Sequence, residues 1–327
     1  MRSISFTEAM NEALREEMRR DPSVYLMGLG LHLSSKGPGL TSGLLEEFGE
    51  QRVRSVPISE PAVAGACVGA ALAGMRPIAY FSLADFAICA LDEILGKAGK
   101  WRYTHGGEGG MSVPLVFLQA MGGYTRSASE HSQAPLALYA HAPGLKIAAP
   151  TTPHDAKGLL KSAIRDDNPV AFFQHKLLGG SEGEVPEEEY CTPFGTARIA
   201  REGSDVTVVA TSYMVKLALE AASSLEEREV DVEVIDPRTI EPLDTERIVE
   251  SVRKTGRLVV VDEDTARCGL GAEIAMQVVE RAFASLRAAP ERVGNPNLPV
   301  PYSPVLEDAV LPSAKKIEEA ILRTLAA

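Results

Sequence analysis

A single acidic residue, Glu60, stands at the start of a predicted helix that is otherwise built from small and apolar residues, within VPISEPAVAGACVGAALAG at 56–74. Because every face of such a helix is apolar or small, we expect it to be buried and Glu60 to lie near an interior surface. A carboxylate in that position needs a partner or a chemical role. The alternative is structural, since Ser59 could cap the helix and an early glutamate suits the helix dipole.

A second polar cluster ends the long glycine-containing segment 121–133, whose last five residues read SEHSQ. Long loops in compact domains often carry function. His131, in the middle of this cluster, could titrate near neutral pH and move protons. The alternative is a histidine in a helix-capping sequence. A serine hydrolase is not favoured, because Ser132 lacks the strand-to-helix context of a nucleophilic serine.

Two acidic groups invite a metal-binding interpretation, Asp166-Asp167 and DED at 262–264. Solvent-exposed turns are the simpler interpretation of both. The second group follows a predicted strand at 258–262, which makes it a candidate interface or effector site. The remaining histidines are spread singly, without metal-binding spacing.

The elements that must position these residues alternate between short apolar strands and helices. Such alternation predicts parallel sheets covered by helices on both faces. Strands are predicted at 24–28, 77–81, 113–118, 145–149, 170–173, 206–210, 230–235 and 258–262. Helices are predicted from a capping box at 5–8 to Arg20, and at 86–100, 153–165 and 213–225. Residues 29–40 are expected to form a loop, and the Gly- and Glu-rich segment 178–193 a linker.

Composition bounds the class of protein. The chain has 327 residues, enough for two domains, and a formal net charge of −12. This charge argues against nucleic acid or an anionic membrane as the main partner. The four cysteines have no ligand-like spacing and are predicted to be reduced core thiols of a cytoplasmic protein. The N-terminus lacks the apolar region of a secretory signal, and no apolar run is long enough to span a bilayer.

The ordered motifs of the chain resemble those of the β subunit of thiamine-diphosphate-dependent 2-oxo acid dehydrogenases, the E1 component. The acetoin, pyruvate and branched-chain types are the most similar. The matching motifs are PISE at 57–60, GMRP at 74–77, ADF at 84–86, RY at 102–103, GG at 106–107, HSQ at 131–133, APGLK at 142–146, DAKGL at 155–159, IRD at 164–166, NP at 168–169, HKLL at 175–178, DPRT at 236–239, PLD at 242–244 and PY at 301–302.

The resemblance implies a role for several residues. The glutamate at the Glu60 position would hydrogen-bond N1′ of the cofactor's aminopyrimidine and favour the imino tautomer that removes the thiazolium C2 proton. The ring of Phe86 would pack against the pyrimidine. Ser82 and Leu83 would lie at the cofactor rim, where the family commonly has a glutamine and an aromatic residue or threonine. His131 would face the reacting carbonyl and the incoming lipoyl group.

The resemblance also implies partners and ions. The chain lacks the Gly-Asp-Gly and Asn pattern that holds the diphosphate through Mg²⁺. That half of the site would lie on an α subunit, in an α2β2 assembly that serves a lipoyl acyltransferase, E2. A K⁺ ion could bind backbone carbonyls around Ala163, Asp166 and Asn168.

The implied fold is α/β with two doubly wound domains. A pyrimidine-binding domain would span residues 1–185, and a smaller transketolase C-terminal-like domain residues 186–327. The chain departs from the family at Leu29, where an acidic residue is usual, at 118–120, and at 124–130, where a Gly-rich run is usual. Two alternatives therefore stay open: half of a split transketolase-like or acyloin-forming carboligase without a lipoyl acceptor, and a non-catalytic subunit that stabilises its partner.

Overall fold

A computed structural model describes residues 1–34, 36, 39–106 and 111–327. Gly107, the second residue of the GG motif, lies outside this described part. The chain folds as two compact units. Unit 1 comprises residues 1–121 and 139–194, and unit 2 comprises residues 122–138 and 195–327.

Unit 1 is organised on a parallel sheet in which the strand order is β6-β7-β5-β4-β2-β3. The strands are β2 (Val24–Leu29), β3 (Val53–Val56), β4 (Arg76–Phe81), β5 (Val116–Met121), β6 (Lys146–Ala148) and β7 (Val170–His175). Most of these match the predicted strands, because each is a continuous apolar run buried on both faces. Strand β3, whose sequence VRSV is half polar, carried no such signal.

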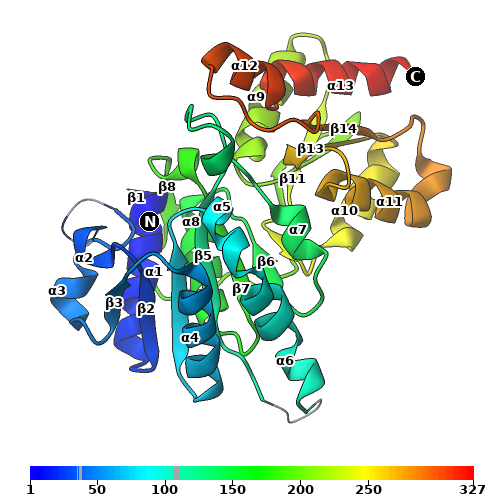
Figure 1. The fold of residues 1–327 in the computed structure, drawn as a ribbon. Coiled ribbons are helices and arrows are strands. Elements are labelled where there is room, and N and C mark those ends of the chain that lie inside the picture. The colour runs from blue at the N-terminus through cyan, green and yellow to red at the C-terminus, as the bar shows by residue number, and fades with distance from the viewer. Residues whose placement is uncertain (35, 37–38, 107–110) are drawn as a thin grey trace. The chain divides into compact units, whose positions relative to one another are not determined.

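Helices cover this sheet, as Figure 1 shows. They are α1 (Phe6–Arg20), α2 (Leu31–Ser34), α3 (Leu44–Phe48), α4 (Glu60–Leu72), α5 (Ala84–Ala87), α6 (Gly99–Thr104) and α8 (Pro153–Arg165). The predicted capping box of α1 is present, with reciprocal bonds between Ser5 and Glu8. The predicted helix 86–100 is instead α5, a 3-10 turn (Ile88–Ala90), a π-helical segment (Asp92–Ala98) and the start of α6. The expected loop 29–40 contains α2.

The segment 178–193 is more ordered than a linker. It contains β8 (Glu182–Val185), which pairs antiparallel with β1 (Arg2–Ser5). Ser162 of α8 also donates to the carbonyl of Thr192 at 2.6 Å. The pairing gave no sequence signal, because EGEV does not alternate apolar and polar residues and its partner strand lies about 180 positions away.

Unit 2 has its own sheet, in the order β14-β13-β10-β11-β9. Its strands are β9 (Arg198–Arg201), β10 (Val206–Ala210), β11 (Val232–Asp236), β13 (Leu258–Thr265) and β14 (Glu291–Asn295), and only β9 is antiparallel to its neighbour. The other elements are α7 (Leu136–Ala140), which starts in unit 2, β12 (Thr239–Glu241), α9 (Tyr213–Glu226), α10 (Thr245–Thr255), α11 (Leu270–Ala282), α12 (Pro304–Val310) and α13 (Ala314–Ala326). Valines of the central strands and alanines of α9 form its core.

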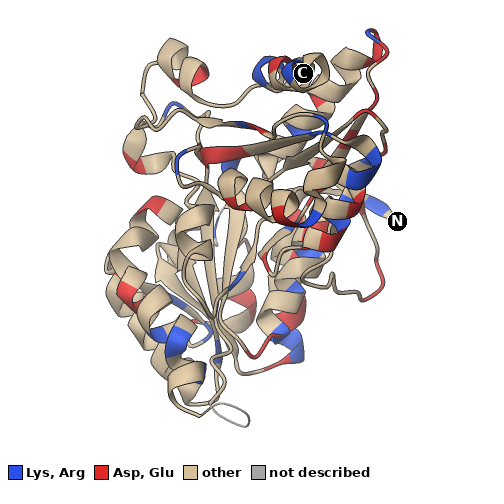
Figure 2. Ribbon diagram, turned by 90° about the vertical axis from the view of Figure 1, so that its right-hand side faces the viewer, with Lys and Arg blue, Asp and Glu red and all other residues tan. Residues whose placement is uncertain are grey.

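Three of the four cysteines are more exposed than the sequence predicted. All four cysteines are free, but only Cys67 is buried, so the prediction of core thiols is wrong for Cys89, Cys191 and Cys268. Cys89 has apolar neighbours in sequence, whereas Cys191 and Cys268 stand in polar segments, and all three side chains are exposed. No helix among the described residues is long and apolar enough to cross a membrane. Figure 2 shows acidic and basic residues interspersed along the ribbon.

Candidate active site

The ends of three adjacent parallel strands build a pocket in unit 1. Strand β4 contributes Tyr80, Phe81 and the following Ser82, while β2 contributes Leu29. The turn after β3 contributes Pro57 and leads into Glu60 at the start of α4. Parallel strands end at the same edge of a sheet, which is where open α/β folds bind ligands. Gly28 permits the close strand packing beside this pocket, because a Cβ there would lie 2.3 Å from the carbonyl oxygen of Tyr80.

Glu60 is half-buried at the edge of this pocket. Within the described part of the chain, its carboxylate has no hydrogen-bond or ion-pair partner. Ser59 occupies the N-cap position of α4 but makes no side-chain capping bond. The capping role offered as the structural alternative is therefore absent, and the carboxylate is available to a ligand.

Helix α4 is less buried than its composition suggested. It packs on the sheet through Val63, Ala64, Cys67, Val68 and Ala71. The opposite side exposes small residues, at 62, 66, 69 and 73. The expectation of a helix buried on every face is wrong for this chain alone, because only the sheet-facing side is covered.

The pocket combines apolar surface with a hydrogen-bond acceptor. Val63, Phe81 and Phe86 supply apolar surface, and the Glu60 carboxylate supplies an acceptor. The enclosed space is about 10 Å³, which is about the size of one water. This chain therefore offers one wall of a site and not a closed cavity. Ser82 and Phe86 line the pocket, whereas Leu83 lies outside its lining, at the N-cap of α5.

His131 lies in unit 2, in a 3-10 turn (Ser129–His131) on the segment 122–138. Its side chain is exposed. The segment closes on itself through a bond of 2.9 Å from the amide of Gly122 to the carbonyl of Gln133. An exposed imidazole on a closed loop can reach a ligand that binds at the surface of unit 2.

The acidic group 262–264 is not a solvent-exposed turn. Asp262 and Glu263 are each 5% exposed at the end of β13. Burial raises the pKa of the Asp262 carboxyl to about 7, and the charge of Asp264 adds to this shift. Burial likewise raises the pKa of Asp264 to about 6. Thr211 donates to one oxygen of Asp262 at 3.0 Å.

The residues proposed for a K⁺ site lie together after α8. The carbonyls of Ala163 and Asp166 already accept bonds, from the amide of Asp166 at 3.3 Å and from Arg76 at 3.0 Å. The Asp166 carboxylate accepts from Lys146 and from the side chain of Asn168. In the described ranges no group of three His, Cys, Asp or Glu side chains could hold a metal. The K⁺ site stays a prediction.

One serine matches the nucleophile pattern Gly-x-Ser-x-Gly, within GGSEG at 179–183. Ser181 lies in the turn before strand β8, and no helix follows it directly. A nucleophilic serine of this type needs a strand-to-helix turn. The match is therefore a coincidence of the glycine-rich turn.

Comparison with known families decides the identity of the fold. Residues 2–181 match the transketolase pyrimidine binding domain, and residues 195–317 match the transketolase C-terminal domain. The chain belongs to the transketolase-like family of E1 β subunits. The two matched ranges together account for both α/β domains expected from the sequence.

Several relatives cover nearly the whole chain. The β subunit of acetoin:2,6-dichlorophenolindophenol oxidoreductase of Cupriavidus necator is 44% identical over 335 residues, which are 99% of this chain and 98% of the relative. The pyruvate dehydrogenase E1 component subunit β of Rickettsia conorii is 46% identical over 97% of both chains. Among solved structures, a split-gene transketolase, described as an inactive β4 tetramer, is 25% identical with a TM-score of 0.81 over 99% of both chains.

The sequence singled out Glu60, Ser82 and Phe86, which line the pocket, but gave no indication of the aromatic wall formed by Tyr80 and Phe81. Both belong to a strand that reads as ordinary sheet core. Their position at the carboxyl end of a parallel strand was the signal that could have identified them.

Proposed function

We propose that the chain is the β subunit of a thiamine-diphosphate enzyme that, with an α subunit in an α2β2 assembly, decarboxylates a 2-oxo acid or cleaves acetoin. The acyl group would pass to a lipoyl group of an E2 acyltransferase. The observation that supports this proposal most directly is the half-buried carboxylate of Glu60, without a partner among the described residues, beside an apolar pocket. When bound, thiamine diphosphate supplies the carbanion-stabilising chemistry.

In this proposal the residues of the chain bind, orient and move protons. Glu60 hydrogen-bonds N1′ of the aminopyrimidine and exchanges a proton with it, which sets the tautomer of the ring. Phe86 packs against the ring, and His131 exchanges a proton with the reacting group. The diphosphate and Mg²⁺ would be held by the α subunit, because this chain carries no Gly-Asp-Gly motif.

A split transketolase-like carboligase is the second candidate. The likeness in fold to the split-gene transketolase supports it. The β subunits of acetoin and pyruvate enzymes, at 44% and 46% identity, support the first candidate more strongly. The two candidate functions differ in the molecule that accepts the acyl or carbonyl fragment. It is a lipoyl group in the first and an aldehyde or ketone in the second.

The test is co-purification with the α subunit and assay with thiamine diphosphate and Mg²⁺. We expect substrate-dependent acylation of a lipoyl domain by the complex and none by either subunit alone. Carboligation without acylation would favour the second candidate. If this chain binds the α subunit but the complex catalyses neither reaction, the result would favour a non-catalytic subunit that stabilises its partner.

Glu60→Gln should lower kcat of the complex by about 100-fold or more, because the variant loses the ionisable group while keeping its shape. The matched control is Glu46→Gln, which also removes a carboxylate from the first turn of a helix, α3, but at an exposed position away from the pocket. If both variants keep full activity, Glu60 acts only on the helix dipole and the proposed role is wrong.

A further inference from the structure

The loop that carries His131 has an unusual backbone. Every second residue from 124 to 128 has a positive φ angle, which is 64° at Tyr124, 57° at Arg126 and 61° at Ala128. Ala128 combines this with ψ of −175°, a region that glycine occupies almost alone. Side chains disfavour these conformations, so the loop keeps its shape only where surrounding contacts hold it.

Residues of unit 2 provide those contacts. The amide of Gly123 donates to the buried carboxylate of Glu263 on β13. The Tyr124 hydroxyl donates to the carbonyl of Pro312 at 2.9 Å, and its ring meets that of Tyr213 edge-on, with 5.4 Å between centroids. Each contact falls on the loop between its closed base at Gly122 and the turn that ends in His131.

Arg126 makes the most extensive of these contacts. Its guanidinium donates to Glu307 at 2.6 Å, to Asp308 at 2.7 Å and to the carbonyl of Pro304 at 3.2 Å, all on α12. Its backbone amide also donates to Glu307, at 3.3 Å. One carboxylate therefore holds both the side chain and the backbone of a residue whose φ is positive.

Glu307 is suited to hold the loop in one position. Its side chain is fully buried, and its second oxygen has no hydrogen-bond partner in the described part of the chain. A buried carboxylate needs a cation, and Arg126 is the ion-pair partner that the described residues give it. Removing Arg126 would leave that charge uncompensated, so the loop and α12 are energetically linked.

We propose that Arg126 and Glu307 are positioning residues, through which α12 of the C-terminal unit fixes His131 for catalysis. This inference rests on the proposed function. Residues other than glycine keep positive φ angles only where contacts hold them, so the ion pair helps to keep the loop in one conformation. A displacement of a reacting group by about 1 Å can cost about 100-fold in rate.

The test uses Arg126→Gln and Glu307→Gln in the complex with the α subunit. Each variant should lower kcat by about 10- to 100-fold, with KM and cofactor affinity changed by less than about twofold. Arg126→Lys should recover most of the loss. Hydrogen exchange at the amides of 123–131 should become faster in both Gln variants, independently of catalysis. The control Arg323→Gln, which breaks the exposed Arg323–Glu291 pair of the same unit, should change neither measurement.

Three results would overturn the proposal. Full kcat in both Gln variants would show that the pair does not position His131. A parallel loss of cofactor affinity and thermal stability, without recovery by Arg126→Lys, would show a structural role only. If the wild-type complex itself lacks activity, the proposed function fails and this inference fails with it.

Discussion

Glu60 shows what a single residue type can and cannot indicate. Its place at the start of a helix of small residues suggested either a structural glutamate, next to a Ser59 cap and suited to the helix dipole, or a reactive one. Ser59 makes no capping bond, and Glu60 lies in the first turn of α4 at the border of a pocket. The functional interpretation therefore depends on the absence of a local partner in the described residues.

Asp262 gives a prediction for pH. Burial raises the pKa of its carboxyl to about 7, well above the ordinary value for aspartate. The folded chain therefore holds this proton over a range where the unfolded chain has released it. The contribution of Asp262 to stability is complete below about pH 4 and is lost as the pH rises through 7. We expect Asp262→Asn, which cannot titrate, to gain stability relative to the wild type over this range, by a few kcal/mol.

Urea unfolding of both proteins between pH 4 and 8 measures this difference. Asp264 titrates in both proteins, so the comparison isolates Asp262. A difference in unfolding free energy that stays constant with pH would contradict a raised pKa at Asp262.

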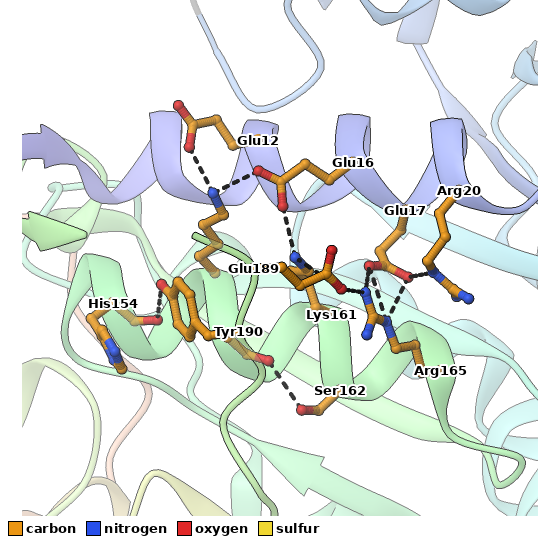
Figure 3. Close-up of polar contacts among 12 residues, drawn as sticks. Glu12, Glu16, Glu17, Arg20, His154, Lys161, Ser162, Arg165, Glu189 and Tyr190 are labelled. Carbon is orange, nitrogen blue, oxygen red and sulfur yellow. Dashed lines mark hydrogen bonds and ion pairs between the residues drawn. The ribbon is translucent and has the colours of Figure 1, made fainter. Parts of the chain in front are cut away.

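At the scale of elements, α1 and α8 are joined by a buried charged interface, which Figure 3 shows. Lys157 and Lys161, which are 1% and 0% exposed, reach from α8 to glutamates of α1. Lys157 pairs with Glu16 at 2.7 Å, and Lys161 pairs with the same side chain at 2.7 Å. These pairs hold the Glu16 pKa below its usual range against the opposing effect of burial. Charge pairing thus replaces apolar packing along part of this helix contact.

Arg165→Met should be the most costly change at this interface. Arg165 donates three bonds of 2.6–3.1 Å to Glu17, which is fully buried. Without it, the one ion pair left to Glu17 among the described residues is with Arg20, whose side chain is 42% exposed. We expect the unfolding free energy to fall by about 2–4 kcal/mol, because a buried carboxylate loses its main counter-charge.

The control for this change is Arg2→Met, which breaks the more exposed pair between Arg2 of β1 and Glu12 of α1. Exposed pairs contribute less than about 1 kcal/mol. Equal losses in the two variants, measured by urea unfolding, would mean that burial of Glu17 does not set the cost.

The sequence predicted well those elements whose caps and spacing of apolar residues lie within the element itself. Helix α8 has the predicted bounds, because Thr152 caps it, Pro153 starts it and its apolar face recurs at helical spacing. Strands β1 and β8 were missed because only their pairing with each other defines them. The π-helical segment at 92–98 was missed for a similar reason, since its composition is that of an ordinary helix.

At the scale of the whole molecule, the residues proposed to act in function come from both units. Glu60, Ser82 and Phe86 belong to unit 1, and His131 belongs to unit 2. The resemblance of ordered motifs supplied this residue set from the sequence. The loop contacts of Arg126 and Glu307 could not be predicted, because these residues lie 181 positions apart and neither stands in a motif.

The proposed division of the cofactor site between two chains predicts how stability responds to the cofactor. This chain supplies a pocket of about 10 Å³ and no diphosphate motif, so thiamine diphosphate and Mg²⁺ should not change the melting temperature of the isolated chain. The complex with the α subunit should be stabilised by about 2.7 kcal/mol at 100 times the dissociation constant. Thermal unfolding of the isolated chain and of the complex, each with and without cofactor, measures the two effects. Glu60→Gln should weaken the stabilisation of the complex, because the aminopyrimidine loses a charged acceptor. Comparable stabilisation of the isolated chain would show that it binds the cofactor alone, and that the site is not shared.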